Sequence, residues 1–255
     1  MAEVGRVAVG QQLIMQKISP AEPVTILKRV PIQDNGEPLV DFQIACPGLV
    51  LDYPRFDYRR ETLVRASVAE KLSEAVRRIP SGYRLGIVEG WRPPHIQRRM
   101  YLATWNRFKA RHPEWSDAQL RRVVNRFTAP MNLRVPPPHS TGGAVDVALL
   151  NEDLKLADMM SPFEWREPQA FPLDAKGLSE TARRHRDILS SAMIGAGITN
   201  YPSEYWHYSY GDQGWAYRGG HEHAIYAAIT PPDYAPDPRD ISDDPLRFLE
   251  ESLRR

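Results

Sequence analysis

Two short segments of the chain hold side chains that could bind a metal ion. The first segment carries His139 and Asp146, and the second begins with Glu204 and ends with His207. Two imidazoles and one carboxylate suit a catalytic zinc site, in which three protein ligands hold the ion and a fourth position stays open for water. The remaining carboxylate, Glu204, could take a proton from that water. If the two segments meet in space, the sequence predicts a metal-dependent hydrolase.

The spacing within the first segment indicates how it folds. His139 and Asp146 are separated by six residues that include Gly142 and Gly143. Because glycine accepts positive φ, we expect a loop that carries His139, a tight turn, and a strand over 144–150 that brings Asp146 back beside the loop. A carboxylate inside an apolar strand is costly unless it is paired or bound to a metal. The alternative is a turn histidine and an edge-strand aspartate without a ligand role.

The second segment lies in an aromatic-rich stretch, residues 200–210, which predicts a strand with Glu204 and His207 near its start. Two residues three apart on a regular strand point to opposite faces. A bend or bulge must therefore bring both side chains to the metal. The alternative is a core strand with both residues at its exposed end.

A third candidate is Arg92, which follows the strand expected at 83–88 and precedes two prolines. An arginine at a strand end, before a helix that begins with proline, can reach into a cleft. There it could stabilise a tetrahedral intermediate or bind a substrate carboxylate. The alternative is an ion pair with Glu89 or a surface arginine.

Other elements must position these residues. Apolar residues recur at helical spacing from about Glu61 to Arg78, and a Pro-Ser-Gly sequence ends that helix. Further helices are expected from Pro93 or Pro94 through Phe108, over 117–127 and over 179–196, with a short terminal helix over 244–249. Helices and short strands without regular β-α-β alternation indicate an α+β fold.

Composition excludes several classes of protein. The chain has 33 basic and 32 acidic residues, so its net charge of +1 gives no argument for nucleic acid or an anionic membrane. No apolar run reaches the roughly 20 residues that cross a bilayer, and the N-terminus lacks the pattern of a signal peptide. The single cysteine, Cys46, fits a reducing compartment. We therefore predict a cytoplasmic protein without a nucleic-acid or membrane partner.

Together, His139 with Asp146, Glu204 with His207, and the upstream Arg92 resemble the D-alanyl-D-alanine dipeptidases. These VanX-like zinc enzymes belong to a superfamily that includes lysostaphin and Sonic hedgehog. The resemblance implies one Zn²⁺ per chain, held by His139, Asp146 and His207. It also implies that Glu204 is the general base and that Arg92 stabilises the transition state.

The resemblance covers about residues 25–230 and implies one zinc dipeptidase domain over 1–255, with an irregular tail over 231–255. The implied fold is α+β, with an antiparallel sheet that carries the site and helices packed on one side. The implied reaction cleaves the small dipeptide D-Ala-D-Ala into two D-alanines in cell-wall precursor metabolism.

The sequence departs from the family pattern in three places. The loop 140–143 reads Ser-Thr-Gly-Gly rather than a basic version. Pro137 stands where the family commonly has a serine that helps to bind substrate, and Tyr205 stands where a tryptophan is more usual. These changes leave the zinc chemistry intact and bear on which dipeptide is preferred.

One alternative function is that of a zinc D,D- or L,D-carboxypeptidase for larger muropeptides. Another is a zinc-stabilised binding module without catalysis, against which Glu204 and Arg92 argue. The sequence does not indicate an oligomeric state.

Overall fold

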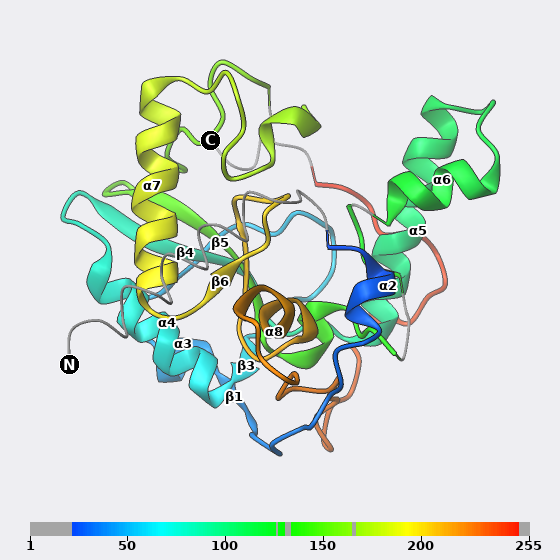
Figure 1. Cartoon of the computed structure of the whole chain (residues 1–255), viewed down its shortest axis with the longest axis horizontal. Coiled ribbons are helices and arrows are strands. Elements are labelled where there is room, and N and C mark those ends of the chain that lie inside the picture. The colour runs from blue at the N-terminus through cyan, green and yellow to red at the C-terminus, as the bar shows by residue number, and fades with distance from the viewer. Residues whose placement is uncertain (1–21, 126, 131–133, 165–166, 250–255) are drawn as a thin grey trace.

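A central sheet carries both of the segments that hold the candidate ligands (Figure 1). The structure is a computed structural model that describes residues 22–125, 127–130, 134–164 and 167–249. The sheet has five strands in the order β2-β4-β5-β7-β6. Their bounds are β2 Val50–Leu51, β4 Tyr83–Glu89, β5 Ala144–Asn151, β7 His207–Ser209 and β6 Thr199–Asn200. All neighbours are antiparallel except β2 and β4, which are parallel.

Helices α4 (Ala66–Arg78) and α7 (Glu180–Gly195) pack against each other and cover one face of this sheet (Figure 1). Alternate residues of β5, among them Val147 and Leu149, point into the core beneath the two helices. Because side chains of a strand alternate between faces, Asp146 lies on the face opposite that core. The sheet therefore separates the apolar core from the face that carries the candidate site.

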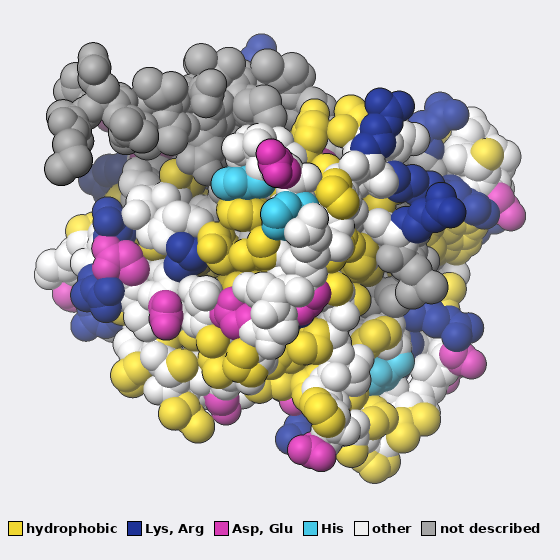
Figure 2. Space-filling model, turned by 60° about the horizontal axis from the view of Figure 1, so that its bottom comes forward, with side chains coloured by type: hydrophobic (Ala, Val, Ile, Leu, Met, Phe, Trp, Pro, Cys, Tyr) yellow, Lys and Arg dark blue, Asp and Glu magenta, His cyan; other side chains and the backbone are white. Residues whose placement is uncertain are grey.

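The remaining elements surround the sheet. A second sheet pairs β1 (Leu39–Asp41) with β3 (Leu63–Arg65). The other helices are α2 Val24–Leu27, α3 Phe42–Ala45, α5 Pro94–Arg111, α6 Asp117–Val124 and α8 Gln213–Gly219, with 3-10 turns η1 Pro138–Thr141, η2 Pro168–Ala170 and η3 Pro238–Asp240. Figure 1 shows α5 and α6 extending to one side of the molecule, and basic side chains gather on that side of the face in Figure 2. No helix in the described ranges is long and apolar enough to cross a membrane.

The predicted α+β class is confirmed, and three element boundaries are corrected. The first long helix begins at Ala66 rather than near Glu61, because residues 63–65 form a strand that pairs with β1. Residues 200–210 do not form one strand: β6 and β7 are joined by a turn that contains Glu204. The helix predicted over 244–249 is wrong, because Phe248 instead forms a bridge with Phe56.

Candidate metal centre

Three buried side chains converge on the face of the sheet opposite α4 and α7. Among the residues that the structure describes, His139, Asp146 and His207 form a group whose potential ligand atoms all lie within 4.8 Å of one another. Oδ1 of Asp146 lies 3.0 Å from Nδ1 of His207 and 3.5 Å from Nε2 of His139. The structure thus brings together the three ligands that the two separate motifs predicted.

The backbone explains this convergence. Asp146 on β5 and His207 on β7 are direct partners in the antiparallel ladder. His139 lies in η1, whose last turn ends at Gly142 with a φ of 71°. A Cβ at Gly142 would lie 2.4 Å from a methyl carbon of Leu39, so a larger residue fits neither the φ nor the space. The predicted glycine turn therefore exists, and it returns the chain to β5.

The imidazole of His139 is oriented by a main-chain group. Its Nδ1 lies 2.8 Å from the carbonyl oxygen of Gly90. A carbonyl only accepts hydrogen bonds, so Nδ1 must donate, and Nε2 is left as the lone-pair atom that faces Asp146. Burial lowers the pKa of His207, which also favours the neutral imidazole that a metal requires. Both histidines are thus prepared to act as ligands.

Asp146 keeps its negative charge in this buried place. Burial alone would raise its pKa, but the nearby positive charge of Arg55 outweighs burial and holds the pKa of the carboxyl well below its usual range. Two nitrogen donors and one ionised oxygen donor are a set that suits zinc. The donor set and its convergence therefore fit the ion that the sequence predicted.

Glu204 reaches the same region from the turn between β6 and β7. The N–H of Glu204 donates to the carbonyl of Tyr201, and the N–H of Tyr201 donates to the carbonyl of His207. This reversal of the chain lets Glu204 and His207 line one cavity although they are three residues apart. Burial and the nearby Asp146 carboxylate raise the pKa of Glu204 to about 8. Two buried carboxyl groups so close together favour a bound cation.

Arg92 also lines this cavity, and it is held on both sides. A register shift in β4 places Glu89 opposite Asp146. Both oxygens of Glu89 accept hydrogen bonds from Arg92, with Nε to Oε1 at 2.7 Å, while Nη1 donates to Gln97 at 2.6 Å. Burial works against the charge of Arg92, but Glu89 outweighs it and raises the pKa of the guanidinium. Arg92 therefore forms the ion pair with Glu89 and also lines the cavity, so two of the alternatives that the sequence offered for this residue occur together.

The structure adds one residue that the sequence did not single out. Nη1 of Arg55 lies 3.6 Å from Oδ2 of Asp146, and its guanidinium lies 4.3 Å from the centre of the Trp206 ring. Arg55 stands in a loop without a recognisable motif, so only the fold reveals its proximity to Asp146.

These side chains line a cavity of about 350 Å³, called here the central cavity. Aromatic rings make up much of its wall, namely Phe56, Tyr58, Phe108, Phe127, Phe171, Tyr201, Trp206 and Phe248. Apolar walls with a few polar groups are typical of sites for small ligands. Among the departures from the family pattern, Pro137 lines the cavity, whereas Tyr205 is buried in the core. The tyrosine therefore bears on packing rather than on substrate contact.

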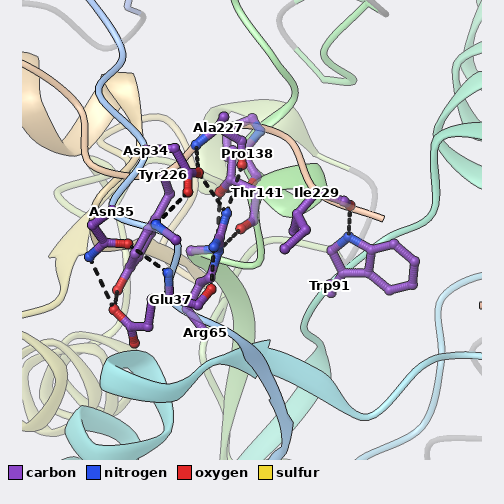
Figure 3. Close-up of polar contacts among 12 residues, drawn as sticks. Asp34, Asn35, Glu37, Arg65, Trp91, Pro138, Thr141, Tyr226, Ala227 and Ile229 are labelled. Carbon is purple, nitrogen blue, oxygen red and sulfur yellow. Dashed lines mark hydrogen bonds and ion pairs between the residues drawn. The ribbon is translucent and has the colours of Figure 1, made fainter. Parts of the chain in front are cut away.

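Arg65 ties the His139 loop to distant parts of the chain (Figure 3). This fully buried guanidinium donates to the carbonyls of Thr141, Glu37 and Ala227, and it pairs with Asp34 at 2.9 Å. In the same view, the indole N–H of Trp91 donates to the carbonyl of Ile229. The loop that presents His139 is therefore fixed by segments before and after it in the sequence.

Arg65→Met is expected to lower the free energy of unfolding by roughly 2–5 kcal/mol, because buried carbonyls and Asp34 lose their donor. Urea unfolding followed by tryptophan fluorescence measures this difference. The control is Arg77→Met, which removes an exposed ion pair with Glu74 and is expected to leave the free energy of unfolding nearly unchanged. Equal effects of the two substitutions would contradict the role given to Arg65.

The site defines a class of protein: a buried His-Asp-His group, a carboxyl group and an arginine on one cavity form the arrangement of a metal-dependent hydrolase. Residues 41–226 match the Peptidase_M15 family, which is described as D-ala-D-ala dipeptidase. The chain belongs to this family. The predicted resemblance and the predicted enzyme class, a metallopeptidase, are thereby confirmed.

Two known proteins are similar to the chain. A curated D-alanyl-D-alanine dipeptidase from Synechocystis sp. is 28% identical over 229 residues, which cover 79% of this chain and 93% of the relative. A solved structure is described as a mutant of the vancomycin-resistance D,D-pentapeptidase VanY, from a VanB-type resistance cassette, in complex with Zn(II). It gives a TM-score of 0.40 at 15% identity and covers 66% of this chain and 86% of that one.

Proposed function

We propose that the protein hydrolyses D-Ala-D-Ala-type dipeptides with one zinc ion held by His139, Asp146 and His207. The observation that carries this proposal is the convergence of these three ligands beside Glu204 in one cavity. Family membership supports the substrate class. Bound zinc would supply Lewis acidity, which activates a water molecule and polarises the scissile carbonyl.

Glu204 is proposed as the general base. It would take a proton from the attacking water and then pass that proton to the leaving amine. Its buried position beside Asp146 raises its affinity for a proton, and a cation at the cluster would lower that affinity again. A carboxyl group under these opposing influences would be able both to accept and to release a proton.

Arg92 is proposed to stabilise the negative charge that develops on the carbonyl oxygen. A guanidinium has five N–H groups, and three of those of Arg92 are used in its bonds to Glu89 and Gln97. The other two remain for the reacting oxygen. Because Glu89 and Gln97 fix the side chain, it needs no rearrangement when the charge forms.

We also propose that the chain forms a single domain and that its location is cytoplasmic. Buried Leu246 from the C-terminal part packs with Ile96 and Met100 of α5, which supports one folding unit. The free, buried Cys46 suits a reducing compartment.

The experiment that tests this function measures release of D-alanine from D-Ala-D-Ala. We expect turnover that falls to about a tenth or less after treatment with a chelator and returns when Zn²⁺ is added. A longer muropeptide that ends in D-Ala-D-Ala serves as the competing substrate. Faster cleavage of the longer peptide would indicate a carboxypeptidase instead. Zinc binding without cleavage of either substrate would indicate a binding module.

A further inference from the structure

Arg55 is a second arginine beside the proposed metal cluster. Oδ1 of Asp146 faces the two histidines, whereas Oδ2 faces the guanidinium of Arg55 at 3.6 Å. The side chain is 20% exposed and lines the central cavity together with Glu204. Its guanidinium lies over the ring of Trp206, 4.3 Å from the ring centre, and this cation–π contact favours its position. Arg55 therefore presents a positive charge to whatever enters the cavity.

Three other arginines that line the cavity, Arg92, Arg218 and Arg60, form strong contacts with protein groups. Arg92 already binds both carboxylate oxygens of Glu89. Arg218 pairs with the buried Glu22, and Arg60 donates to main-chain carbonyls of β4 and of the segment after β2. Arg55 differs because its acidic neighbour is Asp146, which is itself a proposed ligand of the zinc ion. A bound cation therefore leaves excess positive charge at this point, which an anionic group of the substrate would balance.

The C-terminal segment holds Arg55 in this position. The N–H of Leu249 donates to the carbonyl of Arg55 at 3.1 Å, and the N–H of Asp57 donates to the carbonyl of Arg247 at 2.9 Å. Between these bonds, the rings of Phe56 and Phe248 lie 4.4 Å apart. We call residues 246–249 the C-terminal clasp. It lies outside the stretch 41–226 that matches the family.

We propose that Arg55 binds the free carboxylate of the substrate's C-terminal residue and that the C-terminal clasp positions Arg55 for this contact. The inference rests on the proposed dipeptidase function and names how that site recognises its substrate. A planar guanidinium can form two parallel hydrogen bonds with a carboxylate. Pro137, on the same cavity wall, offers no side-chain donor that could replace them.

The test compares D-Ala-D-Ala with its C-terminal amide, which lacks the negative charge. The wild-type enzyme is expected to prefer the free acid in kcat/KM. Arg55→Gln should lower kcat/KM for the acid by about 10- to 100-fold, chiefly through KM, and leave the amide nearly unchanged. Arg55→Lys should give an intermediate loss. The control is Arg98→Gln, an exposed arginine that pairs with Asp243 and does not line the central cavity.

A binding measurement separates this inference from the proposed function. Reduced dipeptides, in which CH₂ replaces the scissile carbonyl, are titrated as acid and as amide by calorimetry into the zinc-loaded protein. Tighter binding of the acid that disappears in Arg55→Gln supports the proposal, even if wild-type protein cleaves neither peptide. An acid preference that Arg55→Gln retains, or equal losses for acid and amide, would overturn it.

Phe248→Ala tests the clasp. This substitution removes the ring that packs on Phe56 and leaves Arg55 itself unchanged. We expect KM for the acid to rise several-fold with an unchanged kcat and an unchanged zinc content. An unchanged preference for the acid over the amide in Phe248→Ala would overturn the positioning role of the clasp.

Discussion

Glu204→Gln is expected to keep about one equivalent of zinc and to lose about 10²–10⁴ in kcat, the usual contribution of a positioned acid-base group. Glutamine preserves the size of the side chain but cannot accept the proton of the attacking water. The three proposed ligands do not include Glu204, so metal content should not change. Turnover of D-Ala-D-Ala and zinc by elemental analysis are the two measurements.

A glutamine variant with undiminished kcat would remove Glu204 from the mechanism. A variant that loses its zinc along with its activity would instead make Glu204 a ligand. Glu164→Gln is a suitable control, because it changes an exposed carboxyl group that does not line the central cavity.

His207→Ala is expected to reduce bound zinc to well under half an equivalent and to lower kcat/KM by at least about 100-fold. Only His139 and Asp146 would remain as ligands, and two donors hold zinc poorly. The variant should also lose the rise in melting temperature that zinc gives to wild-type protein, since a ligand stabilises only the state that binds it.

His223→Ala provides the matched control for this loss. His223 is half-buried and belongs to no metal-binding group found in the described part of the chain. Its replacement should leave the zinc content unchanged. Retention of a full equivalent of zinc by His207→Ala would exclude His207 as a ligand.

Much of this site could be predicted because its chemistry is concentrated in short motifs. His139, Asp146, Glu204 and His207 were predicted from residue type and spacing, and Arg92 from its place after a strand. Where apolar periodicity and capping agreed, the bounds of a long helix were predicted to within a residue or so. Helix α7 is an example: the side chain of its N-cap, Ser179, accepts a hydrogen bond from the N–H of Ala182.

The rest depends on contacts between distant residues, which local patterns do not encode. Residues 63–65 extend the helical pattern of α4, but pairing with β1 makes them a strand. The contact between Arg55 and Asp146 joins residues far apart in the sequence. The bridge between Phe56 and Phe248 spans most of the chain, so a segment that reads as a short helix pairs instead with a loop.

The Arg65 contacts have a consequence for the order in which the molecule forms. The guanidinium joins Asp34, Thr141 and Ala227, so the loop of His139 is fully secured only after residue 227 has been synthesised. Contacts between residues so far apart in the sequence form late, because closing a long loop loses conformational entropy before the contact can stabilise the chain. In a nascent chain that does not yet include Ala227, the loop of His139 would therefore be held less firmly.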